Sequence, residues 1–374
     1  MKKILLGSTA IVAAGMIASV PSADAASKMK LGLGGYMEQW IGFTSGDDGV
    51  GQDYSGINIV SDPEVFFKGK TKLDNGLTIG VNVQLEATQN GDQIDEQYMT
   101  VSGGFGQIII GDENSAQYKM HYAPSDYGIG MNSGDNTVWN KPVSDAEGDS
   151  ISMGSHYRSP FGATYIEPDA VNDSAKISYF TPRVSGFQLG LSYAPDAKQD
   201  SNALPNRDAV NSDYVMVGAN FVQKMGGMSV AISGGYGTVT DAAEGGTEPE
   251  ATSFGIKLGM GGVSAGVSYA NFSDAGNNDQ EGINAGVAYS SGPMGVSLAY
   301  YHGEKDGNNG SALTLDGQAE RDIIHLSAKY AMGPGVTLAG TLGHAVYTSD
   351  DADLHNSVDD SESTYVVMGL KVGF

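Results

Sequence analysis

Apolar and polar residues alternate with a period of two along most of this chain. From Leu77 to Leu85 every second residue is apolar, whereas Asn82 and Glu86 fall on the opposite parity. A period of two is typical of β-strands with one apolar and one polar face. The runs are separated by turn signals such as residues 74–76, an Asp-Asn-Gly sequence that favours a tight hairpin. The pattern predicts an all-β chain of consecutive antiparallel hairpins.

The parity opposite the apolar residues consists mainly of small or polar residues, such as Ser264, Gly266 and Ser268. A soluble sandwich or barrel buries its apolar parity, whereas a transmembrane barrel turns that parity toward lipid. Alternation alone is compatible with both arrangements.

Short and long connections alternate along the chain. The tight turns lie at residues 74–76, 103–104, 225–227, 261–262, 291–293 and 333–334, and the longer polar loops lie around Asp48, Ala197, Glu244, Asn277, Asn308 and Asp353. Transmembrane barrels have short periplasmic turns and long extracellular loops, and a soluble β-protein has no reason for this asymmetry. The connections therefore predict a transmembrane antiparallel β-barrel.

Tyrosine recurs where the strands are expected to meet the long loops. An amphipathic ring suits the headgroup level of a membrane, where barrels carry an aromatic girdle. The alternative explanation is the ordinary preference of tyrosine for strands. The tyrosines expected in this girdle are Tyr193, Tyr236, Tyr269, Tyr289, Tyr300 and Tyr347.

The chain ends in another alternating run, from Val366 to Phe374. About 16 strands can be counted in all, and an even number is typical of bacterial outer-membrane barrels. An even number lets the last strand pair with the first, which leaves no open edge. A barrel of this size encloses an aqueous lumen.

The N-terminus has the features of a secretory signal peptide. Lys2 and Lys3 precede an apolar run, and a small-x-small cleavage site ends at Ala25. The alternative is a membrane-anchor helix, because the run approaches the roughly 20 residues that span a bilayer. We expect residues 1–25 to be removed and residues 26–374 to form the barrel domain.

One stretch, residues 113–173, lacks the alternating pattern. A loop of this length inside a compact domain is uncommon unless it has a function. It contains many more acidic than basic residues, and glycines are interspersed. Its acidic residues are Glu113, Asp126, Asp135, Asp145, Glu147, Asp149, Glu167, Asp169 and Asp173, against Lys119, Lys141 and Arg158.

Charge and cysteine content exclude several classes of function. The formal net charge is −24, and loss of Lys2, Lys3 and Asp24 with the signal peptide changes it to −25. Such an acidic chain repels nucleic acid. The absence of cysteine excludes disulfides and thiolate metal sites, and the histidines lack the paired spacing of a zinc site. No cofactor is predicted, although acidic runs at residues 47–48 and 350–353 could bind Ca²⁺ or simply be solvated.

Two short segments match the sequences of catalytic or phosphate-binding motifs but lack the structural context that those motifs need. Residues 262–266 read Gly-Val-Ser-Ala-Gly, but a nucleophile elbow needs a turn from a strand into a helix, and Ser264 lies within an alternating strand. Residues 69–71 end like a phosphate loop, but Glu64 stands where its first glycine belongs. We therefore expect no enzymatic activity. Two other classes stay open: an outer-membrane enzyme such as a lipid hydrolase, and a structural or adhesive surface barrel whose acidic loops bind cations.

Several segments resemble the general-diffusion porins of Gram-negative outer membranes, specifically the alphaproteobacterial type. The resemblance rests on residues 65–77, 95–98, 103–106 and 110–112 and on the terminal Phe374, in this order and spacing. It covers essentially the whole mature chain. It implies a homotrimer of barrels in the outer membrane that admits small hydrophilic solutes by passive diffusion. It also implies contact with outer-membrane lipid and lipopolysaccharide, and recognition of Phe374 by the outer-membrane assembly machinery.

In that family the third extracellular loop folds into the lumen, and its acidic residues face basic side chains of the wall. Here this loop corresponds to residues 113–173, and Lys68 and Lys70 lie on the lumen-facing parity. The two lysines would create a transverse field, while the large acidic excess favours cations. The resemblance makes the following residues candidates for the pore constriction: Lys68, Lys70, Glu86, Asp126, Asp135, Asp145, Glu147, Asp149 and Arg158.

Overall fold

The computed structural model describes residues 28–46, 53–88, 93–132, 135–140, 158–169, 171–199, 203–273, 279–306, 318–349 and 360–374. The expected signal peptide and the acidic runs at residues 47–48 and 350–353 lie outside these ranges. No helix within them is long and apolar enough to cross a membrane.

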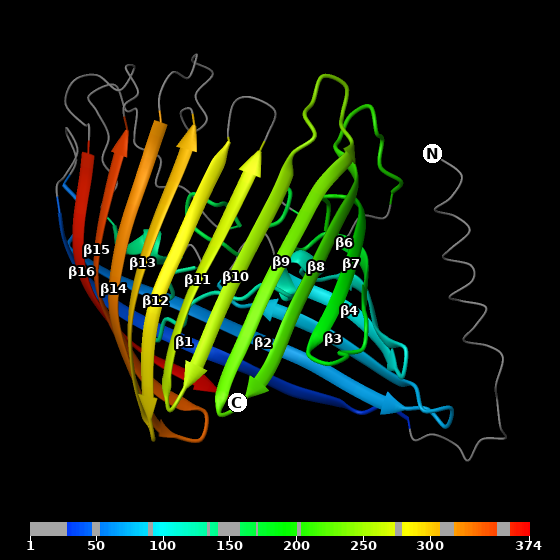
Figure 1. The fold of residues 1–374 in the computed structure, drawn as a ribbon, viewed down its shortest axis with the longest axis horizontal. Coiled ribbons are helices and arrows are strands. Elements are labelled where there is room, and N and C mark those ends of the chain that lie inside the picture. Colours follow the sequence, from blue (N-terminus) through cyan, green and yellow to red (C-terminus); the bar gives the residue numbers. More distant parts are fainter. Residues whose placement is uncertain are drawn as a thin grey trace.

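The described residues form a closed barrel of 16 antiparallel strands, as the alternation predicts (Figure 1). The strands are β1 (Leu31–Gly46), β2 (Ile57–Lys72), β3 (Thr78–Glu86), β4 (Ile94–Gly103), β5 (Gly106–Asp112), β6 (Ala175–Phe180), β7 (Phe187–Asp196), β8 (Ser212–Met225), β9 (Met228–Asp241), β10 (Glu250–Met260), β11 (Val263–Ser273), β12 (Gln280–Ser291), β13 (Met294–Asp306), β14 (Gln318–Gly333), β15 (Val336–Ser349) and β16 (Asp360–Gly373). Each strand pairs with its sequence neighbours.

The first and last strands close the barrel. β1 pairs with β16 from Tyr36 opposite Gly373 to Gly46 opposite Ser363. Beyond this ladder, the backbones of Gly35 and Phe374 exchange two hydrogen bonds of 3.0 Å each. The sheet therefore has no unpaired edge on which another chain could add a strand.

The apolar parity of the strands faces outward. Leu33 and Ile59 are 69% and 68% exposed, whereas Ser192 and Ser268 on the opposite parity are fully buried inside the barrel. A soluble protein would show the reverse. The structure thus settles the question that alternation leaves open, and the outward face is the one that contacts lipid.

The connections alternate as predicted. All six predicted tight turns join an even-numbered strand to the next odd-numbered one, and in Figure 1 several of these turns lie together at the lower rim. Gly76 adopts a φ of +86°, which the hairpin between β2 and β3 requires. A seventh short connection, residues 181–186 between β6 and β7, was not predicted.

The tyrosine prediction is partly wrong. Tyr193, Tyr236 and Tyr269 lie in the halves of their strands next to the long loops. Tyr300 lies at the middle of β13, and Tyr289 lies beside the tight turn that follows β12. Tyr347 is only 1% exposed and points into the barrel. Its odd parity on β15 differs from that of the outward-facing Leu338 and Leu342, so the alternation already placed it inside.

The largest apolar cluster also lies inside the barrel. It consists mainly of large side chains from β1, from β13 to β16 and from the loop between β5 and β6. Packing of that loop against the wall is therefore what creates the core. Its large members include Trp40, Met131, Trp139, Phe161, Tyr301, Tyr347 and Tyr365.

Candidate functional site

The loop between β5 and β6 begins at Glu113, as predicted, and its described part runs inside the barrel (Figure 1). It starts with a one-turn helix, α2 (Ala116–Lys119), whose N-terminus is capped by the Ser115 side chain. A short 3-10 helix, η1 (Asp135–Trp139), follows. The rest of its described part is irregular, so its backbone groups need partners from elsewhere.

Hydroxyl groups of the wall supply many of these partners. The backbone N–H of Ala116 donates to Ser192 Oγ at 2.8 Å, and that of Tyr122 donates to Ser233 Oγ at 2.9 Å. Tyr127 N–H donates to a third wall hydroxyl, Ser297 Oγ, at 3.0 Å. These acceptors lie on β7, β9 and β13, so the loop follows the inner wall around the barrel.

Glycines on the inner wall let the loop backbone approach closely. A Cβ at Gly255 would lie 1.7 Å from the carbonyl oxygen of Tyr122. A Cβ at Gly42 would lie 2.3 Å from the Trp139 ring, and Thr44 Oγ1 donates to the Trp139 carbonyl at 2.7 Å. The small residues on the polar parity therefore form the seat of the loop.

Basic side chains inside the barrel hold the loop in place. The Arg158 guanidinium lies 3.7 Å from the centroid of the Tyr118 ring and 3.5 Å from a Glu167 carboxylate oxygen. Lys176 Nζ donates to the backbone carbonyls of Glu113, Asn172 and Ser174. Both cations are buried within the contacts of the loop, and their charges act on the neighbouring loop acid Asp173.

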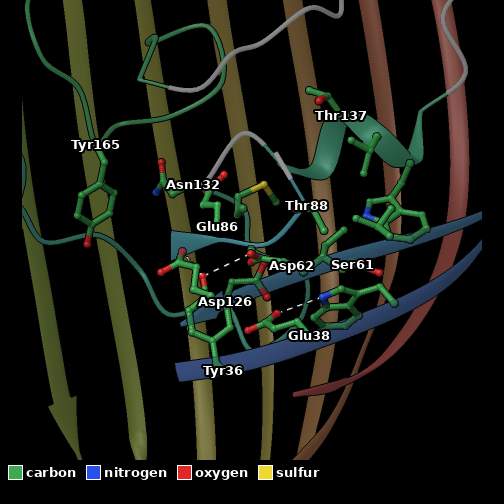
Figure 2. A pocket seen from close by; sticks show the side chains of 18 of the residues that line it. Tyr36, Glu38, Ser61, Asp62, Glu86, Thr88, Asp126, Asn132, Thr137 and Tyr165 are labelled. Carbon is green, nitrogen blue, oxygen red and sulfur yellow. Dashed lines mark hydrogen bonds between the residues drawn. The ribbon is translucent and has the colours of Figure 1, made fainter. Parts of the chain in front are cut away.

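A cavity of about 990 Å³ remains between the loop and the wall formed by β1 to β4. Figure 2 shows wall side chains such as Tyr36 and Asp62 on one side of it and the loop residues Asn132 and Tyr165 on the other. Among the described residues that line it, seven are carboxylates and none is Lys, Arg or His. The seven are Glu38, Asp62, Glu64, Glu86 and Asp95 of the wall, and Asp126 and Asp173 of the loop.

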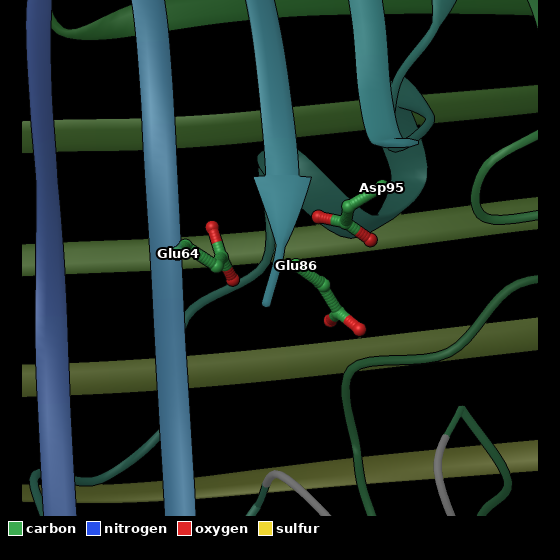
Figure 3. A group of neighbouring side chains, drawn as sticks. All are labelled: Glu64, Glu86 and Asp95. Atoms are coloured by element: carbon green, nitrogen blue, oxygen red, sulfur yellow. The ribbon is translucent and has the colours of Figure 1, made fainter. Parts of the chain in front are cut away.

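Three of the wall carboxylates converge on neighbouring strands. One oxygen each of Glu64, Glu86 and Asp95 lies within 4.8 Å of the others (Figure 3). Glu64 and Glu86 stand directly opposite each other in the β2–β3 ladder, an arrangement that is unfavourable for like charges. Oxygen ligands of this kind suit Ca²⁺ or Mg²⁺, so this cluster could attract a cation in transit.

Neighbouring groups orient two of the wall carboxylates, Glu64 and Glu38. The Tyr36 hydroxyl donates to Glu64. Glu38 accepts a hydrogen bond of 3.1 Å from Trp40 Nε1 and lies 3.0 Å from Lys371 Nζ. These interactions fix the carboxylates but leave the lining acidic.

The loop acids Asp126 and Asp173 differ in their proton affinity. Burial raises the pKa of Asp126, but the hydrogen bond and the charge of His325, 3.1 Å away, outweigh burial and hold that pKa below its ordinary value. Burial, with the nearby charge of Asp95, raises the pKa of Asp173 to about 7. Asp126 is therefore ionised at neutral pH, whereas Asp173 titrates there.

We expect the charge of the cavity to depend on pH through Asp173. A carboxyl with a raised pKa is mostly neutral below that pKa and ionised above it, so the lining gains a negative charge between about pH 6 and pH 8. Any preference for cations should rise over this interval in zero-current potentials of the reconstituted channel. Asp173→Asn should flatten the profile, and a variant that keeps the wild-type profile would contradict this assignment.

The structure places the predicted constriction residues in different surroundings. Glu86 and Asp126 line the cavity. Lys68 and Lys70 share the lumen-facing parity of β2 but lie nearer its short turn and outside the cavity lining, with Lys68 Nζ 3.8 Å from the centroid of the Phe66 ring. Arg158 is enclosed within the loop.

Asp135 is the first residue of η1, and Asp145, Glu147 and Asp149 lie outside the described residues. The role of each candidate in a constriction stays a prediction. The wall acids Glu38, Asp62, Glu64 and Asp95 were not among the candidates. Their one signal in the sequence is that Glu38, Asp62 and Glu64 fall on the polar parity of their strands.

Comparison with known proteins agrees with this architecture. The family model described as Gram-negative porin matches residues 7–351. No curated protein matches the chain.

Several solved structures share the fold at low sequence identity. The trimer form of OmpT, an outer membrane protein of Vibrio cholerae, is 13% identical, with a TM-score of 0.59, and the match covers 93% of this chain and 100% of that one. An anion-selective porin from Comamonas acidovorans is 16% identical, with a TM-score of 0.58 and the same coverage. A mutant of Rh. blastica porin is 16% identical, with a TM-score of 0.54 and coverage of 92% and 100%.

Proposed function

Because this chain belongs to the Gram-negative porin family, whose members are outer-membrane channels for passive diffusion, we propose that its channel prefers cations and admits small hydrophilic solutes. One observation carries the proposal: the described lining of the cavity contains seven carboxylates and no Lys or Arg. A passage lined by one sign of charge raises the local concentration of counter-ions. Cations should therefore enter more readily than anions.

The fold itself does not determine the sign of the ion. The Comamonas acidovorans porin has a similar barrel and is described as anion-selective. The difference must come from the side chains that line the passage. In this chain Lys68 and Lys70 lie nearer the short turns, where we propose that they moderate the cation preference rather than reverse it.

The zero-current potential of the reconstituted wild-type protein across a salt gradient tests the proposal. We expect a potential of the sign given by cation permeation, large in dilute salt and small at 1 M, where the Debye length is only about 3 Å. An anion-selective wild type would show that the acidic lining does not govern permeation. No catalytic role is proposed, because Ser264 lies within β11 and has no strand-to-helix turn around it.

We also propose that the barrel assembles as a homotrimer and that Phe374 is recognised during assembly. The trimer form of the Vibrio cholerae neighbour supports the first part. Phe374 is 65% exposed and thus accessible to a binding partner. The trimer should migrate as a large species on unboiled detergent gels and collapse on boiling, whereas a monomer at both temperatures would contradict it.

A further inference from the structure

An apolar groove of about 520 Å³ crosses the outer, lipid-facing surface of β10 to β14, the strands coloured yellow-green to orange at the front of Figure 1. Its sides include Ile256, Leu258, Leu298 and Ile324. Large outward side chains at the same level, such as Leu326 at 54% exposure, show that this surface belongs to the apolar band of the barrel.

The groove exists because two adjacent strands carry alanine where their neighbours carry larger residues. Ala265 on β11 stands opposite Leu258 and Val287, and Ala285 on β12 stands opposite Val267 and Tyr300. Gly266 and Gly286 also line the groove although they belong to the inward parity. The groove therefore reaches down to the backbone of β11 and β12.

Along the strands from the groove toward the long loops, the outer surface changes from apolar to acidic within two outward-facing residues. One step beyond Tyr300, toward the long loops, the ladder contains Tyr269, Ile283, His302 and Asp322 side by side. One step further it contains Glu281, Glu304 and Glu320. Each step is about 7 Å along a strand, so the acidic row lies at the height expected for lipid headgroups.

Tyrosine hydroxyls form hydrogen bonds to carboxylates one step closer to the long loops. The Tyr269 hydroxyl donates to Glu281 at 2.7 Å, and the Tyr300 hydroxyl donates to Asp322. His302 lies 3.0 Å from Asp322 and 2.9 Å from Glu304. The described outward-facing residues of β11 to β14 include no Lys or Arg, and His302 is already engaged by Asp322 and Glu304, so acidic groups outnumber basic ones in this row.

We infer that this groove binds one acyl chain of a membrane lipid whose headgroup carries an ammonium ion. The apolar lining matches the chain, and the carboxylates above it match the ammonium group, which can donate up to three charge-assisted hydrogen bonds. A second copy related by a two-fold axis is disfavoured, because it would bring the same acidic row against itself. This inference concerns the outer surface and does not depend on the ion preference of the lumen.

Native mass spectrometry of the purified barrel in detergent with EDTA tests the inference, with phosphatidylethanolamine and phosphatidylglycerol of identical acyl chains as probes. We expect a single retained phosphatidylethanolamine per barrel, bound about tenfold more tightly than phosphatidylglycerol, the factor that one charge-assisted hydrogen bond supplies. Glu281→Gln with Asp322→Asn should remove this difference between the two lipids.

Substitutions that fill the groove provide the second part of the experiment. Ala265→Leu with Ala285→Leu should abolish retention of both lipids, because the added side chains occupy the space of the acyl chain. Ala328→Leu is the matched control, because Ala328 is exposed on the outward face of β14 but does not line the groove. This variant should retain as much lipid as the wild type. Mobility on unboiled gels confirms that each variant is folded.

Two outcomes would overturn the inference. If the folded Ala265→Leu/Ala285→Leu variant retained as much lipid as the wild type, the lipid would bind outside the groove. Equal binding of phosphatidylglycerol that appears only on addition of Ca²⁺ would mean that an anionic lipid bridged by a divalent cation is the occupant.

Discussion

Combined replacement of Glu64, Glu86 and Asp95 by Gln, Gln and Asn should lower the cation preference of this channel about tenfold in dilute salt. A unit charge about 4 Å from a passing ion contributes roughly 1 kcal/mol even in bulk water, and about 1.4 kcal/mol corresponds to a tenfold change. The three side chains keep their shapes in these substitutions, so the change isolates charge. Their oxygens meet within 4.8 Å, and all three residues line the cavity.

Zero-current potentials of wild type and the triple variant across a salt gradient measure this effect. The difference should be large near 0.01 M salt, where the Debye length is about 30 Å, and nearly absent at 1 M, where it is about 3 Å. Asp74→Asn serves as the control, because it removes one acidic charge at the exposed turn between β2 and β3, away from the cavity. If the triple variant kept the wild-type potential at low salt, permeating ions would not pass this cluster.

The strand count, the pairing order and the orientation of the two faces could all be predicted from local information. A period of two fixes which side chains share a face, and the alternating lengths of the connections fix which face meets lipid. Tyr347 shows where aromatic content misleads. It was assigned by residue type, whereas its parity relative to Leu338 and Leu342 places it inside the barrel.

The acidic wall of the cavity could not be predicted in the same way. Glu38, Asp62, Glu64, Glu86 and Asp95 are spread over four strands, and only the register of those strands brings them together. A shift of two residues would preserve every face and still separate Glu64 from Glu86. Register depends on turn geometry and on packing across strands, which parity alone does not specify.

The meaning of the small inward residues was also hidden in the sequence. Ser192, Ser233 and Ser297 look like ordinary polar-face residues until the loop backbone is placed against them. They are separated by up to 170 residues from their partners on the loop. A loop without its own periodicity gives no indication of the wall residues that it contacts. The seat of the loop therefore becomes visible only in the structure.

This seat leads to a second large expected effect: Gly255→Val should reduce the single-channel conductance. A Cβ at Gly255 would lie 1.7 Å from the Tyr122 carbonyl oxygen, and Tyr122 also donates its N–H to Ser233 Oγ at 2.9 Å. The rigid wall strand cannot yield as readily as the irregular loop, so the loop should move into the cavity. Because conduction depends on pore width, we expect a decrease of about twofold or more.

Gly234→Val is the matched control, because Gly234 pairs with Phe254 on the adjacent rung and a Cβ there meets nothing within 4 Å. Both variants introduce the same side chain into neighbouring strands, but Gly234 lies on the outward face. The conductance of the Gly234→Val variant should therefore equal that of wild type. Conductance in 1 M salt separates width from charge, because screening suppresses the electrostatic contribution. Wild-type conductance in a folded Gly255→Val barrel would mean that the loop at Tyr122 moves along the wall instead of into the cavity, and that the seat does not control the width of the passage.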